Sequence, residues 1–406
     1  MSTFAVRSIT ALRALASLAK PRARAGEPVR RILIAHYLLL GDTILLAPLL
    51  KKLAMLYPQA ERVVLTRPAV APLFERRPYG AIAMPFNRRD AASRRSVIDS
   101  GPYDLAIVPD DNRYAWLARA AGARRVIGFA NDKPAWKNVM LDRAVPYPDR
   151  TGAWADIAAR CLIDDRADAL VDALVDDASI AAVEGFRAGE WPAPDAMRLE
   201  PSLDQLAQPC AVLHVGASTP LKQWPAERWR ALADRLIADG LHIVWSGGAG
   251  ERSVVDAVGM RVGVHTGETD LVGRLDLPQL WQLLARARLL VCPDTGIAHL
   301  ARIVGVPTVA LFGPGSSVIH GAGVFWADAP FRAITVVDFF CRDQHTLYRR
   351  DVAWVRRCGR RFDPDALPSG RSDPSACGEA LCMKALQLDA IYDAALALLR
   401  TSGESR

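Results

Sequence analysis

Hydrophobic and polar positions alternate along most of the chain in a way that predicts parallel β-sheets covered by helices. From residue 31 onward, short runs rich in β-branched residues are separated by longer segments with apolar residues at helical spacing. Strands that alternate with helices in this order build a parallel sheet with helices packed on its faces. We therefore predict an α/β fold.

The first half of the chain holds four predicted strands and a helix-rich stretch. A polar segment containing Trp191-Pro192-Ala193-Pro194 follows and is typical of a linker between domains. We predict a basic extension at 1–30, a first Rossmann-like domain at 31–190 and a linker at 191–209. The predicted strands lie at 31–36, 62–66, 104–108 and 125–129, and the helix-rich stretch at 151–186.

The second half repeats this pattern, and we assign residues 210–406 to a second Rossmann-like domain. Pro225 begins a predicted helix, and Gly240 ends it. Two successive open sheets place the expected ligand site in the crevice at the carboxyl ends of their strands. The strands predicted here lie at 211–215, 241–245, 289–292 and 308–312.

Composition and charge narrow the choice of partner. At 406 residues, with 51% hydrophobic and 23% charged residues, the chain has the composition of a well-cored protein of two domains. Its formal net charge of +7 favours an anionic partner, which could be nucleic acid, a membrane surface or a phosphorylated substrate. The positive charge is dispersed and no nucleic-acid motif accompanies it, so we expect no nucleic-acid partner.

The N-terminal extension predicts a short basic amphipathic helix. It carries several arginines and a lysine against one acid, Glu27, with leucines at helical spacing. One reading is peripheral attachment to an anionic inner leaflet, and the other is a frayed, solvated extension. No apolar run reaches the ~18–20 residues of a membrane span, and no signal peptide is evident, so we expect a cytoplasmic protein. The apolar stripe is Ile9, Leu12, Leu15 and Leu18.

Leu40-Gly41-Asp42-Thr43 directly follows the first strand. Gly41 permits a tight turn from strand to helix, and Asp42 then stands at the start of the next helix, facing the crevice. A carboxylate at that place could take a proton from an attacking hydroxyl. The alternative is a helix N-cap, for which aspartate is also preferred.

Two segments of the second half suit a phosphate. Gly216 to Pro225 places small and hydroxylic residues and Lys222 between a strand and a helix, so backbone N–H groups, hydroxyls and an ammonium can cradle an anion. Asp294-Thr295-Gly296 lies between a buried strand and a helix, whose N-terminus favours a pyrophosphate, and His299 follows one turn later. The candidate donor-binding residues are Ser218, Thr219, Lys222, Asp294, Thr295, Gly296 and His299.

The order of these motifs resembles glycosyltransferase family 9, the ADP-heptose:lipopolysaccharide heptosyltransferases. The motifs that carry the resemblance are Leu40-Gly41-Asp42, Lys222-Gln223-Trp224-Pro225, Thr266-Gly267, Asp294-Thr295-Gly296 with His299-Leu300, and Phe312-Gly313-Pro314. The similarity covers roughly residues 31–314. One departure is that Leu38 and Leu39 stand where family members commonly have serine or threonine.

The resemblance implies a GT-B architecture, in which an acceptor domain and a donor domain face each other across a central cleft. It implies an inverting, metal-independent transfer of heptose from ADP-heptose to a lipopolysaccharide core or related surface glycan. Asp42 matches the proposed catalytic base, and Lys222 the lysine on the donor phosphate. We further expect Arg88, Arg89 and Lys133 to contact the anionic acceptor, and we expect no metal and no cofactor.

The final third contains an irregular stretch rich in arginine and cysteine, which we place as an insertion at 341–384. Its four cysteines could bind zinc or iron, but none of their spacings is C-x-x-C, so we favour a loop whose arginines face anions near the crevice. The cysteines are Cys341, Cys358, Cys377 and Cys382, and the arginines are Arg342, Arg349, Arg350, Arg356 and Arg357.

Other functions stay open at this point. Within enzymes, the alternatives are a GT-B transferase that uses another sugar nucleotide and a protein O-heptosyltransferase. A non-catalytic α/β protein that binds a nucleotide or glycan is the alternative from another class.

Overall fold

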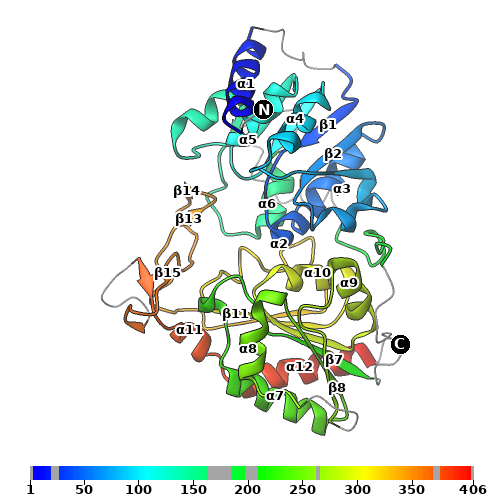
Figure 1. Ribbon diagram of the computed structural model, residues 1–406, viewed down its shortest axis with the longest axis vertical. Helices are drawn as coiled ribbons and strands as arrows, with labels where there is room; N and C mark the ends of the chain where they lie inside the picture. Colours follow the sequence, from blue (N-terminus) through cyan, green and yellow to red (C-terminus); the bar gives the residue numbers. More distant parts are fainter. Residues whose placement is uncertain are drawn as a thin grey trace.

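The computed structural model describes residues 3–19, 27–162, 184–196, 209–261, 266–368 and 375–403. Two parallel six-stranded sheets, each with its own helices, lie one above the other along the long axis of the molecule (Figure 1). In each sheet the first strand along the chain pairs with both the second and the fourth, so the spatial order is that of a Rossmann fold. Two Rossmann-like sheets were predicted, and this prediction is confirmed.

The first sheet is buried because helices cover both of its faces. Its predicted strands are present, and the two further strands, β3 and β6, are short or half-exposed. In spatial order the strands are β3 (Ala81–Pro85), β2 (Glu61–Thr66), β1 (Arg31–Ile34), β4 (Leu105–Val108), β5 (Arg125–Phe129) and β6 (Arg143–Val145). The helices are α1 (Thr3–Ser17), α2 (Leu40–Ile44), α3 (Ala47–Leu56), α4 (Ala91–Asp99), α5 (Arg113–Ala120) and α6 (Trp154–Cys161), with 3₁₀ turns η1 (Ala71–Phe74), η2 (Pro78–Gly80) and η3 (Ala135–Met140).

The second sheet follows the same plan, and its four central strands, β11, β10, β7 and β8, fall where the apolar runs predicted them. In spatial order its strands are β12 (Phe331–Thr335), β11 (Thr308–Phe312), β10 (Leu289–Pro293), β7 (Cys210–His214), β8 (His242–Ser246) and β9 (Glu268–Asp270). Its helices are α7 (Ala226–Ala238), α8 (Arg252–Ala257), α9 (Leu277–Arg286), α10 (Gly296–Val304), α11 (Leu381–Lys384) and α12 (Leu388–Gly403), with turns η7 (Pro220–Lys222) and η8 (Ala249–Glu251).

Helix α1 docks on the first domain instead of fraying into solvent. Its buried side chains are Val6, Thr10 and Ala14, which lie on the face toward α5 and α4. For the described residues 3–19 the reading of a frayed extension is therefore wrong, because this narrow stripe of small residues lets the helix pack closely. The leucines of the predicted apolar stripe lie on other faces and stay exposed, namely Leu12, Leu15 and Leu18.

The segment 184–196 runs back along the first domain. Trp191 is buried, stacks edge-on against Phe74 and donates its indole N–H to the carbonyl of Leu73 at 2.8 Å. The described start of the predicted linker is thus anchored to the domain that precedes it. Most of the predicted helix-rich stretch and the remaining linker, 163–183 and 197–208, lie outside the described residues.

The insertion forms a small arm that reaches from the second domain to the first (Figure 1). The hairpin of β13 (Thr346–Leu347) and β14 (Arg350–Asp351) is its tip, and the paired β15 (Arg361–Phe362) and β16 (Ala376–Cys377) lie at its base. Arg350 is buried and donates to the carbonyls of Asp110 and Ala130, both after strands of the first sheet. The arm therefore ties the two domains together.

No helix among the described residues is long and apolar enough to cross a membrane.

Candidate functional site

The candidate site lies where the two sheets turn their switch points toward each other. Helix α2 follows β1, and α10 follows β10, so each helix begins beside the place where the strand order of its sheet reverses. Side chains from both domains and from the arm line one cavity of about 270 Å³. They are Leu39, Gly41 and Asp42 from the first domain, Ser218, Lys222, Asp294, Thr295, Gly296, His299 and His320 from the second, and Leu347, Tyr348 and Arg357 from the insertion.

Glycines let the two helices approach closely at this cavity. A Cβ added to Gly41 would lie 2.5 Å from the Cδ2 atom of His299 and 3.1 Å from the Cα atom of Gly296. A Cβ on Gly296 would lie 2.9 Å from the side chain of Leu40. Any side chain at either position would therefore push α2 away from α10. Gly41, which was expected to permit a turn from strand to helix, therefore also permits the close contact between the two domains.

Asp42 is not an N-cap, contrary to one of the two roles considered for it. Leu39 occupies the cap position of α2, and no side chain caps the helix. Asp42 instead accepts a hydrogen bond from the phenol of Tyr348 at 2.9 Å, and the Nε2 atom of His320 lies 3.8 Å away. Both contacts are to Oδ1, and with 22% of its side chain exposed Asp42 can meet a ligand in the cavity.

Tyr348 is held at the tip of the β13–β14 hairpin. Tyr348 and Arg349 have φ values of 44° and 66°, the left-handed backbone of a two-residue hairpin turn that normally uses glycine or asparagine. Such strain persists where surrounding contacts fix it, and here the ring packs 5.1 Å from that of Trp154. Burial and the adjacent Asp42 raise the pKa of Tyr348 well above its usual value. Tyr348 therefore stays a phenol that donates to Asp42.

Lys222 and Asp294 form an ion pair at the opposite wall. The ammonium donates to Oδ2 of Asp294 at 2.9 Å and to its backbone carbonyl at 2.7 Å. Burial acts to raise the pKa of Asp294, but the charges of Lys222 and His320 and the hydrogen bond from Lys222 outweigh it and lower the pKa to about 2. Because an ammonium has three N–H donors, one remains for a ligand.

The N-terminus of α10 presents polar atoms that lack partners. Within the described part of the chain, Thr295 Oγ1, His299 Nδ1 and His320 Nδ1 are buried without a hydrogen bond. Burial, Arg302 and His320 lower the pKa of His299 well below its usual value, so its imidazole is neutral. Together with the free backbone N–H groups of a helix start, these atoms suit a ligand rich in acceptor oxygens.

Six of the seven predicted donor-binding residues meet in this cavity, together with Asp42, and His320 and Tyr348 also line it. Thr219 does not line it, because its hydroxyl accepts from the Leu221 N–H at 3.4 Å and caps η7. Sequence reasoning missed the roles of Tyr348 and His320. No motif marks either one, since both come from irregular segments placed by tertiary contacts.

The insertion arginines differ in their surroundings, so the expectation that all five face anions is corrected. Arg357 lines the cavity. Arg342 is buried and donates to the carbonyls of Phe312 and Gly313, and Arg350 holds the arm to the first domain. Buried backbone oxygens need donors, and an arginine fork supplies several at once. Arg349 and Arg356 do not line the cavity.

The predicted acceptor-binding residues lie outside this cavity. Arg88 and Arg89 line a separate pocket of the first domain. Lys133 forms an exposed ion pair with Asp351 of the arm at 2.5 Å. Their predicted role in acceptor binding stays a prediction.

The four insertion cysteines gather at the base of the arm. Three are buried, namely Cys341, Cys377 and Cys382. A hydrogen bond with Cys341 and the nearby Arg360 lower the pKa of Cys358 to about 6, although burial opposes this. Among the described residues, no three or more His, Cys, Asp or Glu side chains are placed together to hold a metal.

Comparison with known proteins identifies relatives of the chain. Residues 94–323, more than half of its length, match the family described as Glycosyltransferase family 9 (heptosyltransferase). Lipopolysaccharide heptosyltransferase 3 of Escherichia coli is 24% identical over 326 residues, which cover 77% of this chain and 89% of that enzyme. Lipopolysaccharide heptosyltransferase 1 of Pseudomonas aeruginosa is 35% identical over 116 residues, but these cover only 28% of this chain and 31% of that enzyme.

A solved structure shows the same fold. The solved structure of E. coli ADP-heptose lps heptosyltransferase II superposes with a TM-score of 0.65, covering 92% of this chain and 99% of that one at 19% identity. The predicted GT-B architecture is therefore confirmed.

Proposed function

The chain belongs to glycosyltransferase family 9, and on that premise we propose that it transfers a heptose from ADP-heptose to an anionic glycolipid acceptor of the lipopolysaccharide type. The observation that carries the proposal is the arrangement of the interdomain cavity. A carboxylate, Asp42, stands on the acceptor side, and the start of α10 with Lys222 stands on the other. A displacement at a sugar carbon needs these two functions on opposite sides of the reacting atom.

On the donor side, the residues match a nucleotide diphosphate. The third N–H of Lys222, the hydroxyl of Thr295 and the backbone N–H groups of α10 would bind the phosphate oxygens. Arg357 adds a second cation at the same cavity. The E. coli enzyme whose structure superposes on this chain is named an ADP-heptose lps heptosyltransferase. This name supports ADP-heptose as the donor over other sugar nucleotides.

On the acceptor side, Asp42 would act as the general base. Its carboxylate takes the proton of the acceptor hydroxyl, whose oxygen forms a bond to the anomeric carbon of the heptose. The bond between that carbon and the phosphate oxygen of ADP breaks, and its electron pair leaves with ADP. Attack from the face opposite the leaving group inverts the anomeric configuration. Preorganised donors that stabilise the departing diphosphate supply several kcal/mol without a metal.

Tyr348 would position the base. Its phenol donates to Oδ1 of Asp42 at 2.9 Å, which fixes the carboxylate and directs Oδ2 to the acceptor. The arm that carries Tyr348 belongs to the second domain but contacts the first. We infer that the arm couples the approach of the two domains to the alignment of the base.

The acceptor and the place of reaction follow from the same proposal. A lipopolysaccharide-type acceptor is anionic and membrane-bound, which fits the net charge of +7 and the exposed leucines of α1. We place the reaction at the cytoplasmic face of the inner membrane, with the protein in peripheral contact.

The test is a transfer assay with the purified full-length protein. It is given ADP-heptose and glycolipid extracted from cells that lack this protein, and both ADP release and the mass of the glycolipid are measured. We expect ADP release that depends on the extract, with a product heavier by one heptose. Turnover of a UDP-sugar, with none of ADP-heptose, would refute the proposal that ADP-heptose is the donor. Nucleotide binding without turnover in any extract would indicate a non-catalytic binding protein.

A further inference from the structure

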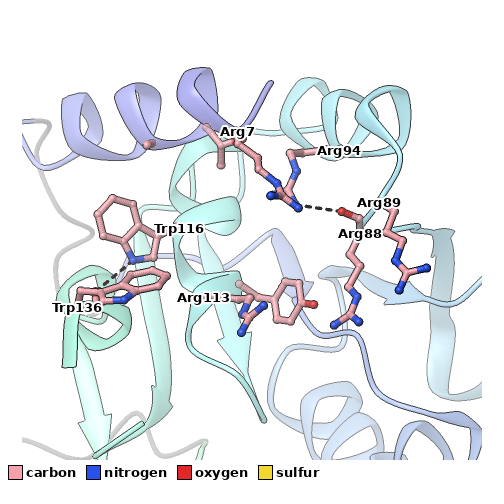
Figure 2. Close-up of a pocket in the computed structure, with 10 residues that line it drawn as sticks. Arg7, Arg88, Arg89, Arg94, Arg113, Trp116 and Trp136 are labelled. Atoms are coloured by element: carbon pink, nitrogen blue, oxygen red, sulfur yellow. Dashed lines mark hydrogen bonds between the residues drawn. The ribbon is translucent and has the colours of Figure 1, made fainter. Parts of the chain in front are cut away.

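A second pocket lies on the first domain, beneath helix α1. It has a volume of about 480 Å³ and shares no residue with the interdomain cavity. Five arginines line it, from three helices and the loop after β3 (Figure 2). They are Arg7 of α1, Arg88 and Arg89 of the loop, Arg94 of α4 and Arg113 of α5. We call it the arginine pocket.

The positive charge of the arginine pocket is largely uncompensated. Arg113 forms an ion pair with Asp111 at 2.8 Å. Within the described part of the chain the other four arginines form no ion pair, and Arg94 makes only a long hydrogen bond of 3.4 Å to the carbonyl of Arg88. Burial and the proximity of Arg7 and Arg113 lower the pKa of the Arg94 guanidinium. Like charges held this closely favour a bound anion.

The opposite wall of the pocket is aromatic. Trp116 and Trp136 meet edge-on with ring centroids 5.9 Å apart, and the indole N–H of Trp116 donates to the carbonyl of Trp136 (Figure 2). About half of Trp136 is exposed. Cationic forks facing indole rings can bind a ligand with a charged group and a less polar body.

The pocket adjoins the acceptor side of the interdomain cavity. The Arg88 guanidinium lies 5.3 Å from the ring centre of Tyr37. Tyr37 belongs to the loop between β1 and α2, and Leu39 of the same loop already lines the interdomain cavity together with Asp42. The loop between β1 and α2 therefore borders the arginine pocket through Tyr37 and the interdomain cavity through Leu39.

We propose that the arginine pocket binds a phosphorylated sugar of the acceptor and anchors the acceptor while a neighbouring hydroxyl reaches Asp42. The identity of the ligand rests on the proposed function. The arginine fork pairs with two phosphate oxygens at once, and arginines on separate elements can surround a dianion. Helix α1 contributes Arg7, so the N-terminal extension forms part of the binding site.

The test measures binding of glucose 6-phosphate to the full-length protein by calorimetry. Saturating ADP is present so that the interdomain phosphate site is filled, and glucose serves as the uncharged control. Arg94→Gln and Arg7→Gln should each weaken binding roughly three- to tenfold, as expected for a charge-assisted contact with partial exposure. Arg13→Gln is the matched control, since Arg13 lies on the same helix outside the pocket and its ion pair with Asp99, at 3.7 Å, is exposed.

The outcomes separate this proposal from its competitor and from the transferase function. Equal affinity in the parent and in both pocket variants, or no binding of glucose 6-phosphate, would overturn the proposal. A second experiment measures binding to phosphatidylglycerol and phosphatidylcholine vesicles, because the exposed leucines of α1 make a phospholipid headgroup the competing ligand. If the pocket variants alter only binding to the anionic vesicles, the pocket is a lipid site and the proposal fails. Neither experiment depends on sugar transfer, so a failed transfer assay does not change what they say about ligand binding in the arginine pocket.

Discussion

Replacing Lys222 by methionine should separate its structural role from its role in donor binding. The substitution keeps most of the side-chain volume but leaves the Asp294 carboxylate, of which 4% is exposed, without its cation. Removing one partner of a buried pair costs about 3–5 kcal/mol. Because 22% of the Lys222 side chain is exposed, we expect the lower limit, about 3 kcal/mol, in the free energy of unfolding.

The double variant Lys222→Met/Asp294→Asn provides the control. Asparagine removes the unpaired charge, so most of the lost stability should return. The charge-assisted contact to the donor stays lost, so both variants should bind ADP roughly 10- to 100-fold more weakly than the parent. Urea unfolding and calorimetry with ADP measure the two quantities separately.

Two results would exclude these roles of Lys222. If Lys222→Met unfolds at the same urea concentration as the parent, the ion pair does not stabilise the fold. If the variant binds ADP as tightly as the parent, Lys222 serves Asp294 alone and the phosphate contact must come from elsewhere in the cavity.

Three further predictions concern the helix contact, the buried histidines and metals. Gly41→Ala should displace α2 from α10 because its Cβ would lie 2.5 Å from His299, so we expect at least a tenfold loss of transfer, and unchanged kinetics would contradict the close contact. Burial lowers the pKa of His214 to about 4, and the unfolded chain binds a proton below pH 6.5. When the pH falls from 7.5 to 5, the parent should therefore lose about 2 kcal/mol more free energy of unfolding than His214→Asn does. An equal loss in both proteins would show that His214 does not cause the acid destabilisation. Activity should survive EDTA, whereas loss of activity that iron or zinc restores would indicate a metal site at the insertion cysteines.

The sequence predicted the parts of the site that local structure determines. A strand, a glycine turn and a helix start place Asp42 and Asp294 at strand ends, and parallel sheets bring such ends to one edge. The central strands were predicted for the same reason, since burial on both faces gives continuous apolar runs. The strands that were missed, such as β9 and β12, are short or half-exposed and carry polar residues.

The remaining parts of the site depend on contacts between distant segments. Tyr348 reaches Asp42 across 306 positions of the chain, through a hairpin whose strained turn has no glycine to mark it. The cap role considered for Asp42 failed because α2 begins earlier than the carboxylate suggests, at Leu40. The arginine pocket needs Arg7 beside Arg94, and only the docking of α1 brings them together.

Asp42→Asn tests whether Asp42 removes the proton from the acceptor hydroxyl. Asparagine keeps the shape of the side chain and can still accept from Tyr348, but it cannot take a proton at neutral pH. Since Leu39 and not Asp42 is the cap, we expect little change in thermal stability. Tyr348→Phe is the companion variant, which removes the hydrogen bond and keeps the ring packed on Trp154.

The decisive measurement is the turnover of ADP-heptose with acceptor by Asp42→Asn. If Asp42 is the general base, turnover should fall by about 10²–10⁴-fold with ADP affinity unchanged, and Tyr348→Phe should lose less, about tenfold. Turnover by Asp42→Asn within a few-fold of the parent would show that Asp42 is not the base, which would then have to be another group on the acceptor side of the cavity.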